Sequence, residues 1–388
     1  MAPWVGAAGY ADAVAATSSS RKRSLAARSI APRTSTIKIL DLFAGAGGLT
    51  AGFHSVDPRF ESVRAVEKDR AAAATYSLNF GPVAYVGKIE DWLAEDSVPD
   101  VDVIVGGPPC QGFSTLGKRD VDDTRNFLWQ EYAQTILKAQ PQYFVVENVA
   151  TFLKSPQFTR LVARTRGNGK LRNYTLQATI LNSADFGAPQ ARKRAVIIGH
   201  RRELDFPGFP EPTHTRDSYM TVEQALKGVA RTVERTELFD RWISFDGHQL
   251  PGVFTSRELH VTRYYTSTSK ARMRHIPVDG NRHDIPNELL SDAWKNHKSG
   301  SSDVMGRLHL DRPSVTIRTE FFKPEKGRYL HPTEDRAITH FEAARLQGFP
   351  DDFKWAGTKT DIARQIGNAV PMALARAIGS RLSNSIPN

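Results

Sequence analysis

Cysteine is almost absent from this chain: Cys110 is the only one among 388 residues. A single cysteine excludes a disulfide within the chain, and such a sequence suits a reducing compartment. Long apolar runs are also missing, since no stretch approaches the roughly 18 consecutive apolar residues that a membrane-spanning helix needs. The sequence therefore predicts a cytoplasmic protein that does not enter a membrane.

Acidic residues are fewer than basic ones, 42 against 52, which leaves a formal net charge of +10. This surplus favours a polyanionic partner such as nucleic acid. Residues 1–36 carry a single acid, Asp12, among many Ala, Ser and Arg residues, and we interpret them as a disordered basic tail. An organelle transit peptide has a similar composition, so import into an organelle stays open as an alternative.

Short apolar runs alternate with helical stretches between Ile37 and about His200. Strands are predicted at 37–43, 62–68, 83–86, 101–107, 143–149, 175–181 and 194–200, with a helix over 69–79. This alternation predicts an α/β, Rossmann-like fold with a mixed, mostly parallel sheet covered by helices on both faces. Ligands bind such sheets beyond the carboxyl ends of the strands.

The first predicted strand leads into "AGAGGLTAGF", where Gly45, Gly47 and Gly48 form the turn into a helix. Glycines allow a tight turn and close approach of the backbone to a ligand. Glu67 follows about 20 residues later, at the end of the second strand, where an acid can bind ribose hydroxyls. The pattern suits a nicotinamide, flavin or S-adenosylmethionine site, or a turn that serves packing alone.

The lone thiol lies in "GGPPCQGFS", directly after the predicted strand 101–107. Pro108 and Pro109 fix two φ angles at about −65° and so restrict where the thiol points. A lone cysteine is usually inert and buried, but a packing cysteine more often lies within an apolar run than after two prolines. Position alone supports a nucleophile and a packing residue equally.

Further polar residues follow the later strands. Glu147 ends the apolar run "YFVVENV", and burial there would raise the pKa of its carboxyl and favour the protonated form; an acid that caps the next helix is the alternative. Arg192 and Arg194 are two apart and would share one face of a strand. Such a pair can anchor phosphates or a base carbonyl, or form an exposed basic edge.

A thiolate, a protonatable carboxyl and an arginine beside a nucleoside pocket suit methylation of cytosine. Carbon 5 of cytosine is too weak a nucleophile to take a methyl group directly. Addition of a thiolate at C6 makes C5 nucleophilic, while a carboxyl at N3 stabilises the developing charge and an arginine holds O2. After transfer, a base removes the C5 proton and the thiol leaves.

The ordered motifs between Asp41 and about Pro371 resemble those of the DNA (cytosine-5) methyltransferase family. They read "DLFAGAGGLTAGF", "GGPPCQGFS", "ENV", "QARKR", "RPSVTIR" and "QIGNAVP". Any one of them arises by chance, but their joint order and spacing do not. The resemblance implies a Rossmann-like methyltransferase fold with a smaller target-recognition domain, and a bacterial modification enzyme that methylates DNA.

The same resemblance implies roles for individual residues. Cys110 would be the nucleophile, Glu147 the partner of N3, and Arg192 and Arg194 would lie at the flipped cytosine and the DNA backbone. Ser114 would also contact that backbone. The implied cofactor is S-adenosyl-L-methionine, without a metal, and its implied binding residues are Asp41, Phe43, Ala44, Gly45, Gly47, Gly48, Leu49, Glu67, Lys68, Ile89, Pro109, Leu128, Asn368 and Ala369.

One position departs from the family pattern. The family usually has an Asp after the third strand, at the adenine amine of the cofactor, whereas "VGKIED" places Lys88 there. Glu90 or Asp91 could substitute, or packing of Ile89 could suffice. The departure concerns one cofactor contact and leaves the reaction unchanged.

The strand and helix alternation stops after about residue 200. We interpret 201–305 as the target-recognition region, between a catalytic domain at 37–200 and its completion at 306–388. Within "VTRYYTSTSKARMRH" we expect DNA contacts from Arg263, Arg272 and Arg274. In the last part, Thr339 and Glu342 predict a capping box, Gly348 a helix end, and Pro371 the first turn of the last helix.

The expected partner is double-stranded DNA, from which the cytosine must be flipped. A cognate restriction endonuclease is a further possible partner, and we expect a monomer. One alternative is a tRNA substrate, but that branch of the family carries "CFT" after "ENV", where this chain has "ENVATFLKS". The other is a catalytically silent DNA-binding relative, which would have lost Cys110, Glu147 or the glycine turn.

Overall fold

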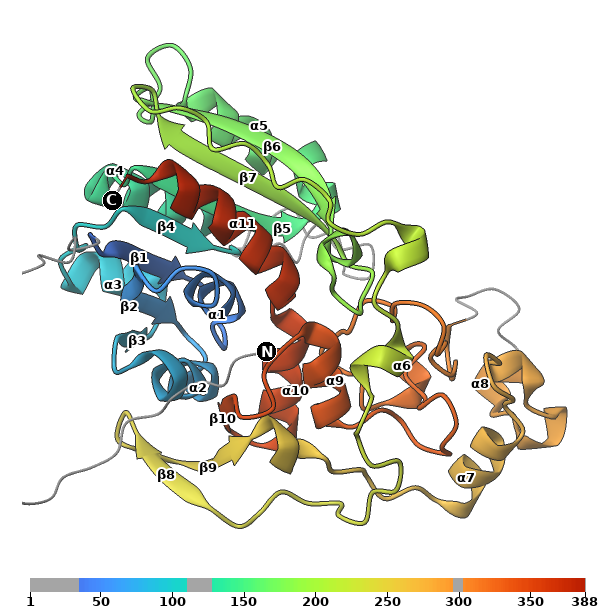
Figure 1. The fold of residues 1–388 in the computed structure, drawn as a ribbon. Helices are drawn as coiled ribbons and strands as arrows, with labels where there is room; N and C mark the ends of the chain where they lie inside the picture. Colours follow the sequence, from blue (N-terminus) through green and yellow to red (C-terminus); the bar gives the residue numbers. More distant parts are fainter. Residues whose placement is uncertain (1–34, 110–127, 296–302, 388) are drawn as a thin grey trace, which may run out of the picture. The chain divides into compact units, whose positions relative to one another are not determined.

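A mixed seven-stranded sheet, in the order β3-β2-β1-β4-β5-β7-β6, forms the centre of the fold (Figure 1). The computed structural model describes residues 35–109, 128–295 and 303–387. Residues 1–34 of the basic tail, Cys110 and Ser114 therefore lie outside the described residues. The strands of this sheet are β1 (Ile37–Leu42), β2 (Phe60–Glu67), β3 (Ala84–Val86), β4 (Val103–Gly106), β5 (Tyr143–Val149), β6 (Tyr174–Asn182) and β7 (Lys193–Arg201).

Strands β3, β2, β1, β4 and β5 pair in parallel, as the predicted alternation requires. Strand β7 pairs antiparallel with both β5 and β6, so it is inserted between them against the main strand direction. The link from 183 to 192 holds only a short 3₁₀ helix, and it is shorter than the dozen or so residues of a parallel crossover. The predicted mixed, mostly parallel α/β sheet is confirmed.

Helices cover both faces of this sheet. One face buries Ile37, Val103 and Val145 under α1 (Gly48–His54) and α11 (Met372–Ser385). The other face buries Leu40, Ile104 and their neighbours under three helices, α3 (Ile89–Glu95), α4 (Leu128–Ala139) and α5 (Pro156–Arg164). Because α11 belongs to the C-terminal segment, the sheet is completed by residues far away in sequence (Figure 1).

A second, three-stranded antiparallel sheet joins region 201–305 to the C-terminal segment. It pairs the hairpin of β8 (Trp242–Phe245) and β9 (His248–Thr255) with β10 (Lys354–Ala356). Strand β10 lies against α2 (Arg70–Phe80), where the Ala356 amide donates to Thr75 Oγ1 at 2.9 Å. Phe254 and Leu259 share one core with Trp355 and Phe341. The first part of region 201–305 thus packs with the C-terminal segment.

The remaining part of that region has a separate small core, to which Leu330 of the C-terminal segment contributes. It consists of six buried residues, Tyr265, Met273, Ile276, Ile285, Met305 and Leu330. Around it lie α7 (Ser267–Arg274) and α8 (Asp292–Lys295), and α6 (Val222–Ala225) comes earlier in the region. Regular structure is sparse here, so buried Arg307 satisfies free backbone carbonyls instead, donating to Ile276 at 2.8 Å and to Met273 at 3.0 Å.

The C-terminal helices follow the capping signals of the sequence. Helix α9 (His340–Gln347) begins with the capping box of Thr339 and Glu342 and ends at Gly348, whose φ of 88° is left-handed. Helix α10 (Lys359–Asn368) follows, and Pro371 lies directly before α11 rather than in its first turn. None of the helices in the described ranges combines the length and the apolar character needed to cross a bilayer.

Candidate active site

The carboxyl ends of β1, β2, β4 and β5 carry the predicted site residues. After β1 the chain turns sharply into α1, with φ of 56° at Phe43 and Gly45 and 84° at Gly47. Gly47 is needed for space as well, because a Cβ there would lie 2.3 Å from the Phe80 ring. A Cβ on Gly45 would meet no atom of the described residues within 4 Å, so among these residues open space lies beside the turn where a ligand can approach the backbone.

Glu67, the last residue of β2, faces this turn. Its Oε2 accepts a hydrogen bond from the Gly45 amide at 2.9 Å, and its Oε1 accepts one from the Asp69 amide at 2.8 Å. Burial raises the pKa of the Glu67 carboxyl, while these two amides oppose that shift. The turn and the carboxyl together provide backbone and acceptor groups suited to a nucleoside with ribose hydroxyls, as the sequence predicts.

Asp41 lies beneath the turn and is buried. Its Oδ2 accepts a hydrogen bond from Thr50 Oγ1 at 2.7 Å, which ties the end of β1 to α1. Thr50 Oγ1 lies 3.0 Å from the Tyr76 hydroxyl, which donates to Ser62 Oγ at 3.1 Å. Burial raises the pKa of Asp41 to about 7, against the hydrogen bond from Thr50. Asp41 therefore supports the turn from below through buried hydroxyls.

The other predicted cofactor residues surround the same strand ends. The amide of Ala44 donates to the Val66 carbonyl at 3.2 Å, and Gly48 and Leu49 are buried in α1. Lys68 is exposed after β2. Two residues border the undescribed segment 110–127: half-buried Pro109 and Leu128, which begins α4. At the end of α10, Asn368 is exposed and Ala369 is buried.

The unusual Lys88 precedes α3 at its N-cap position, with an exposed side chain that caps no amide. Glu90 and Asp91 lie exposed in the first turn of that helix. Ile89 is buried and packs in the core below the sheet. The sequence suggested Ile89, Glu90 or Asp91 as the residue that contacts the adenine of the cofactor, and Ile89 is the buried one of the three.

Glu147 and Arg194 meet where the strands β5 and β7 pair. Arg194 Nε donates to Glu147 Oε1 at 2.7 Å, and both side chains are largely buried, with exposed fractions of 13% and 11%. The neighbouring Asn148 donates from Nδ2 to the Pro108 carbonyl at 2.8 Å. The strand end that carries Glu147 is thereby fixed against the diproline that precedes Cys110. Burial of Glu147 agrees with the sequence argument, but its arginine partner was not predicted.

Arg192 takes a different direction from Arg194. Strand β7 begins only at Lys193, so the prediction that both arginines share one face of a strand is wrong. Arg192 is buried and donates from its two terminal nitrogens to the carbonyls of Ile317 at 2.8 Å and Gly367 at 3.0 Å. Burial, together with neighbouring Arg194, lowers the pKa of Arg192 to about 9. The side chain connects β7 to the C-terminal segment.

Two buried glutamines that the sequence argument did not single out support the same connection. Gln190 Nε2 donates to Gln347 Oε1 at 2.8 Å, and Gln190 Oε1 accepts from the Ile317 amide at 2.8 Å. Gln347 Nε2 in turn donates to the Ile366 carbonyl. Gln190 could have been found in the sequence because it begins the motif "QARKR". Gln347 could have been found because it is a polar residue among apolar ones on its helix. In the described ranges no cluster of His, Cys, Asp or Glu is placed to bind a metal.

Comparison with known proteins connects this geometry to a family. Residues 37–384 match the family model described as C-5 cytosine-specific DNA methylase. The chain belongs to this family. The methyltransferase is 33% identical over 386 residues to the type II methyltransferase M.XorII of Xanthomonas oryzae pv. oryzae, covering 89% of this chain and 84% of that relative. It is 34% identical to M1.HphI of Haemophilus parahaemolyticus, covering 88% and 86%.

Solved structures agree on the fold of this methyltransferase. A protein described as a DNA modification methyltransferase encoded within an E. coli prophage superposes with a TM-score of 0.67 at 25% identity, over 90% of this chain and 99% of that one. The S. pombe Dnmt2 methyltransferase has a TM-score of 0.53 at 20% identity over 90% and 99%, and shows the fold alone. The resemblance found in the sequence is confirmed.

The protein is therefore a DNA cytosine-5 methyltransferase, and its methyl donor is S-adenosylmethionine. The donor supplies an electrophilic methyl group bound to a sulfonium. The residues present fit such a group, because the left-handed glycine turn leaves open space at Gly45 and places the Glu67 carboxyl at its mouth.

Proposed function

We propose that this methyltransferase modifies one cytosine of a specific duplex DNA sequence, within a restriction–modification system, through a covalent bond between Cys110 and C6. The observation that carries the proposal is the buried pair of Glu147 and Arg194 beside Pro108. A carboxyl and a guanidinium are thus held together next to the segment that leads into the cysteine. This is the arrangement that addition of a thiolate to a cytosine ring requires.

Each residue has a defined part in this reaction. Addition of the Cys110 thiolate forms the S–C6 bond and pushes electron density toward N3 and C5. Glu147 faces N3 and stabilises the developing charge there through a proton, while Arg194 holds the Glu147 carboxyl and binds O2. After C5 has taken the methyl group, a base removes the C5 proton and the electron pair expels the thiolate. The methylated DNA and the used methyl donor can then leave the enzyme.

The cofactor half is assigned to the residues predicted from the sequence. The glycine turn from Phe43 to Leu49 would follow the methionine part of the donor, and Glu67 its ribose. Ile89 would pack against its adenine, and Asn368 and Ala369 would border it from α10. Arg192 positions the site, because it joins β7 to Gly367 just before these two residues. Ser114 would contact the DNA backbone.

The first experiment measures methyl transfer from labelled donor to duplex DNA, with tRNA in parallel. We expect transfer to DNA alone, loss of transfer in Cys110→Ala, and a fall in kcat of roughly 10²- to 10⁴-fold in Glu147→Gln. Binding of the donor, measured by calorimetry, should be unchanged in both variants. Undiminished transfer by Cys110→Ala would refute the covalent mechanism, and transfer to tRNA alone would refute the substrate.

The covalent step has its own test. A duplex with 5-fluorocytosine at the target base blocks removal of the C5 substituent, so the adduct with the wild-type enzyme should persist in denaturing gel electrophoresis. Cys110→Ser serves as the matched control, since its hydroxyl is a far weaker nucleophile. Absence of an adduct on a duplex that the enzyme methylates would contradict attack by the thiol.

The biological setting is proposed from the relatives, which are named type II methyltransferases. We infer cytoplasmic action on double-stranded DNA by a monomer, and a cognate endonuclease with the same recognition sequence. Bisulfite sequencing of DNA from cells that express the protein would give that sequence. The same DNA should resist cleavage by an endonuclease specific for it, and full cleavage would contradict the protective role.

A further inference from the structure

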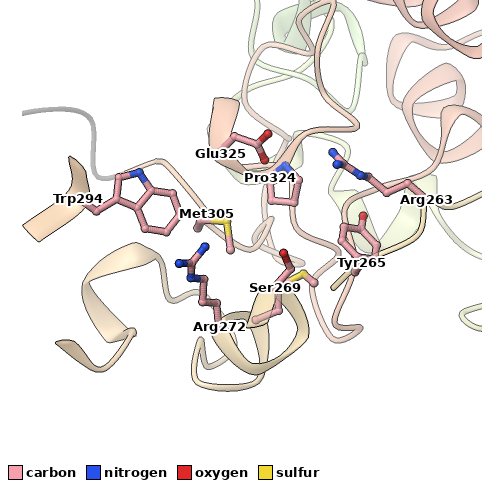
Figure 2. Close-up of a pocket in the computed structure, with 9 residues that line it drawn as sticks. Arg263, Tyr265, Ser269, Arg272, Trp294, Met305, Pro324 and Glu325 are labelled. Atoms are coloured by element: carbon pink, nitrogen blue, oxygen red, sulfur yellow. The ribbon is translucent and has the colours of Figure 1, made fainter. Parts of the chain in front are cut away.

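Two of the three arginines expected to contact DNA line a single cavity, formed by region 201–305 together with Pro324 and Glu325 of the C-terminal segment. Arg263 and Arg272 border a space of about 260 Å³, together with Trp294, Met305 and Glu325. Figure 2 shows their side chains around this space, which is close to the lower end of the volumes found for small-molecule pockets, ~300 Å³. A single planar group therefore fits the cavity better than an extended ligand.

Aromatic rings support both guanidinium groups. The Arg263 guanidinium carbon lies 5.6 Å from the centre of the Tyr265 ring, and that of Arg272 lies 5.2 Å from the centre of the Trp294 ring. Arg272 also donates from Nε to the Leu289 carbonyl at 2.6 Å, which fixes the direction of its terminal nitrogens. Within the described residues neither arginine has a carboxylate partner. Two oriented groups of donors thus remain available to a ligand.

The remaining wall decides the class of ligand. Glu325 contributes a carboxylate, which accepts hydrogen bonds and repels anions. A phosphate group would be attracted by the arginines but repelled by this carboxylate. Buried Met305 and Pro324 provide an apolar surface suited to a flat ring. The cavity thus calls for a planar group with acceptors on one side and donors on another.

Guanine has this pattern. Its O6 and N7 are acceptors for an arginine, and its N1–H and 2-amino groups are donors that a carboxylate can accept. Adenine and thymine offer no adjacent pair of acceptors to a guanidinium. Cytosine carries its acceptors O2 and N3 on the same edge as its amine, so it has no separate edge of two donors for the carboxylate. A cavity is concave and takes up a base, whereas an intact groove is read by a protruding element.

We propose that this cavity binds one guanine of the DNA recognition sequence, displaced from its stack, with Arg272 at O6 and N7, Glu325 at the N1–H and amino groups, and Arg263 lining the opposite side of the cavity (Figure 2). The inference rests on the proposed function, since it assumes a specific duplex substrate. It makes these three side chains determinants of sequence specificity, separate from the pair of Glu147 and Arg194 that acts on the target cytosine.

Arg274 provides a matched control on the same helix. Its side chain is 71% exposed and lies 3.9 Å from the Asp335 carboxylate, and it is not among the residues that line the cavity. We expect Arg274 to contact phosphate alone. Its replacement by Ala should weaken binding to all duplexes alike and lower the slope of log affinity against log salt by about 1.

The experiment uses the full chain and a library of duplexes randomised around the target, read by bisulfite sequencing. Wild type should require guanine at one position other than the target pair. Arg272→Ala and Glu325→Gln should both relax the requirement at that same position, and slow methylation of the wild-type sequence roughly 10- to 100-fold. Arg274→Ala should keep the requirement. Donor binding and thermal unfolding verify that each variant is folded, and exposed Arg263→Ala provides a second, less disruptive variant.

A base analogue tests the contact directly. Replacing the required guanine by 7-deazaguanine removes N7, so methylation by wild type should slow while that by Arg272→Ala should not slow further. An unchanged requirement in both Arg272→Ala and Glu325→Gln would overturn the inference, as would a uniform loss of affinity with a reduced salt slope, which identifies a phosphate contact. Wild-type enzyme that methylates no duplex would instead refute the proposed function.

Discussion

Replacement of Asp41 by Asn tests the electrostatics beneath the glycine turn. Burial raises the pKa of this carboxyl from its usual 3.8 to about 7, although the Thr50 hydroxyl and the nearby Glu67 also act on it. In the folded protein Asp41 therefore keeps its proton up to about pH 7, whereas the unfolded chain releases it near pH 4. Between these values the unfolded state binds fewer protons, so the free energy of unfolding falls as pH rises.

The size of the effect follows from the shift. Each pH unit in this window costs ~1.4 kcal/mol, so wild type loses about 4 kcal/mol of stability between pH 4 and pH 7 through this group. Asparagine does not titrate, and its amide oxygen can still accept the hydrogen bond from Thr50. The free energy of unfolding of Asp41→Asn relative to wild type should therefore rise by about 4 kcal/mol across this window.

Urea denaturation followed by circular dichroism at pH 4 to 8, without the methyl donor, measures this difference. Thr50→Val is the matched control, because it keeps the volume but removes the hydroxyl that favours the charged carboxyl. In Thr50→Val the pKa of Asp41 should rise further, so the free energy of unfolding should keep falling up to a higher pH than in wild type. Parallel pH profiles for wild type and Asp41→Asn would refute the reasoning.

Three further predictions concern packing and buried polar groups. Gly52→Ala places a Cβ 2.3 Å from the Cβ of Ala375 in α11, and should lower the free energy of unfolding by roughly 1–3 kcal/mol in urea denaturation, partly recovered by Ala375→Gly. Gln347→Ala removes the shorter of the two acceptors of the Gln190 amide and leaves only the Leu346 carbonyl at 3.4 Å; it should cost about 1–3 kcal/mol, read from thermal unfolding, and an unchanged Tm would contradict it. Arg336→Met removes both guanidinium hydrogen bonds to buried Glu342 and should cost about 3–5 kcal/mol, most of it recovered in the double variant with Glu342→Leu, which still lacks the Glu342 half of the capping box.

Much of the sheet could be predicted because its signals are local. Strands β1, β4 and β5 are short runs rich in apolar residues, and the capping box at Thr339 needs only four consecutive residues. The inserted strand β7 could have been inferred from its short link to β6. By contrast, the pairing of β9 with β10 joins residues about a hundred positions apart, and no local pattern indicates such a partner.

The site shows the same division. The sequence placed Glu67 and Glu147 at strand ends, where the structure has them, because both follow apolar runs. The partner of Glu147 could not be predicted, since Arg192 and Arg194 look equivalent in "QARKR". Only packing separates them: the strand starts after Arg192, whose guanidinium then reaches carbonyls of the C-terminal segment.

The position of α11 has a consequence for biosynthesis. Strands β1 to β7 are all translated by residue 201, yet one face of their sheet is covered only in part, by α1, until Leu374, Ile378 and Leu382 have left the ribosome. At roughly 5–20 residues per second, that interval lasts on the order of ten to forty seconds. The nascent chain exposes part of this apolar surface throughout that interval. Methylation therefore begins only after translation of each chain is almost finished, a delay built into the order of its elements.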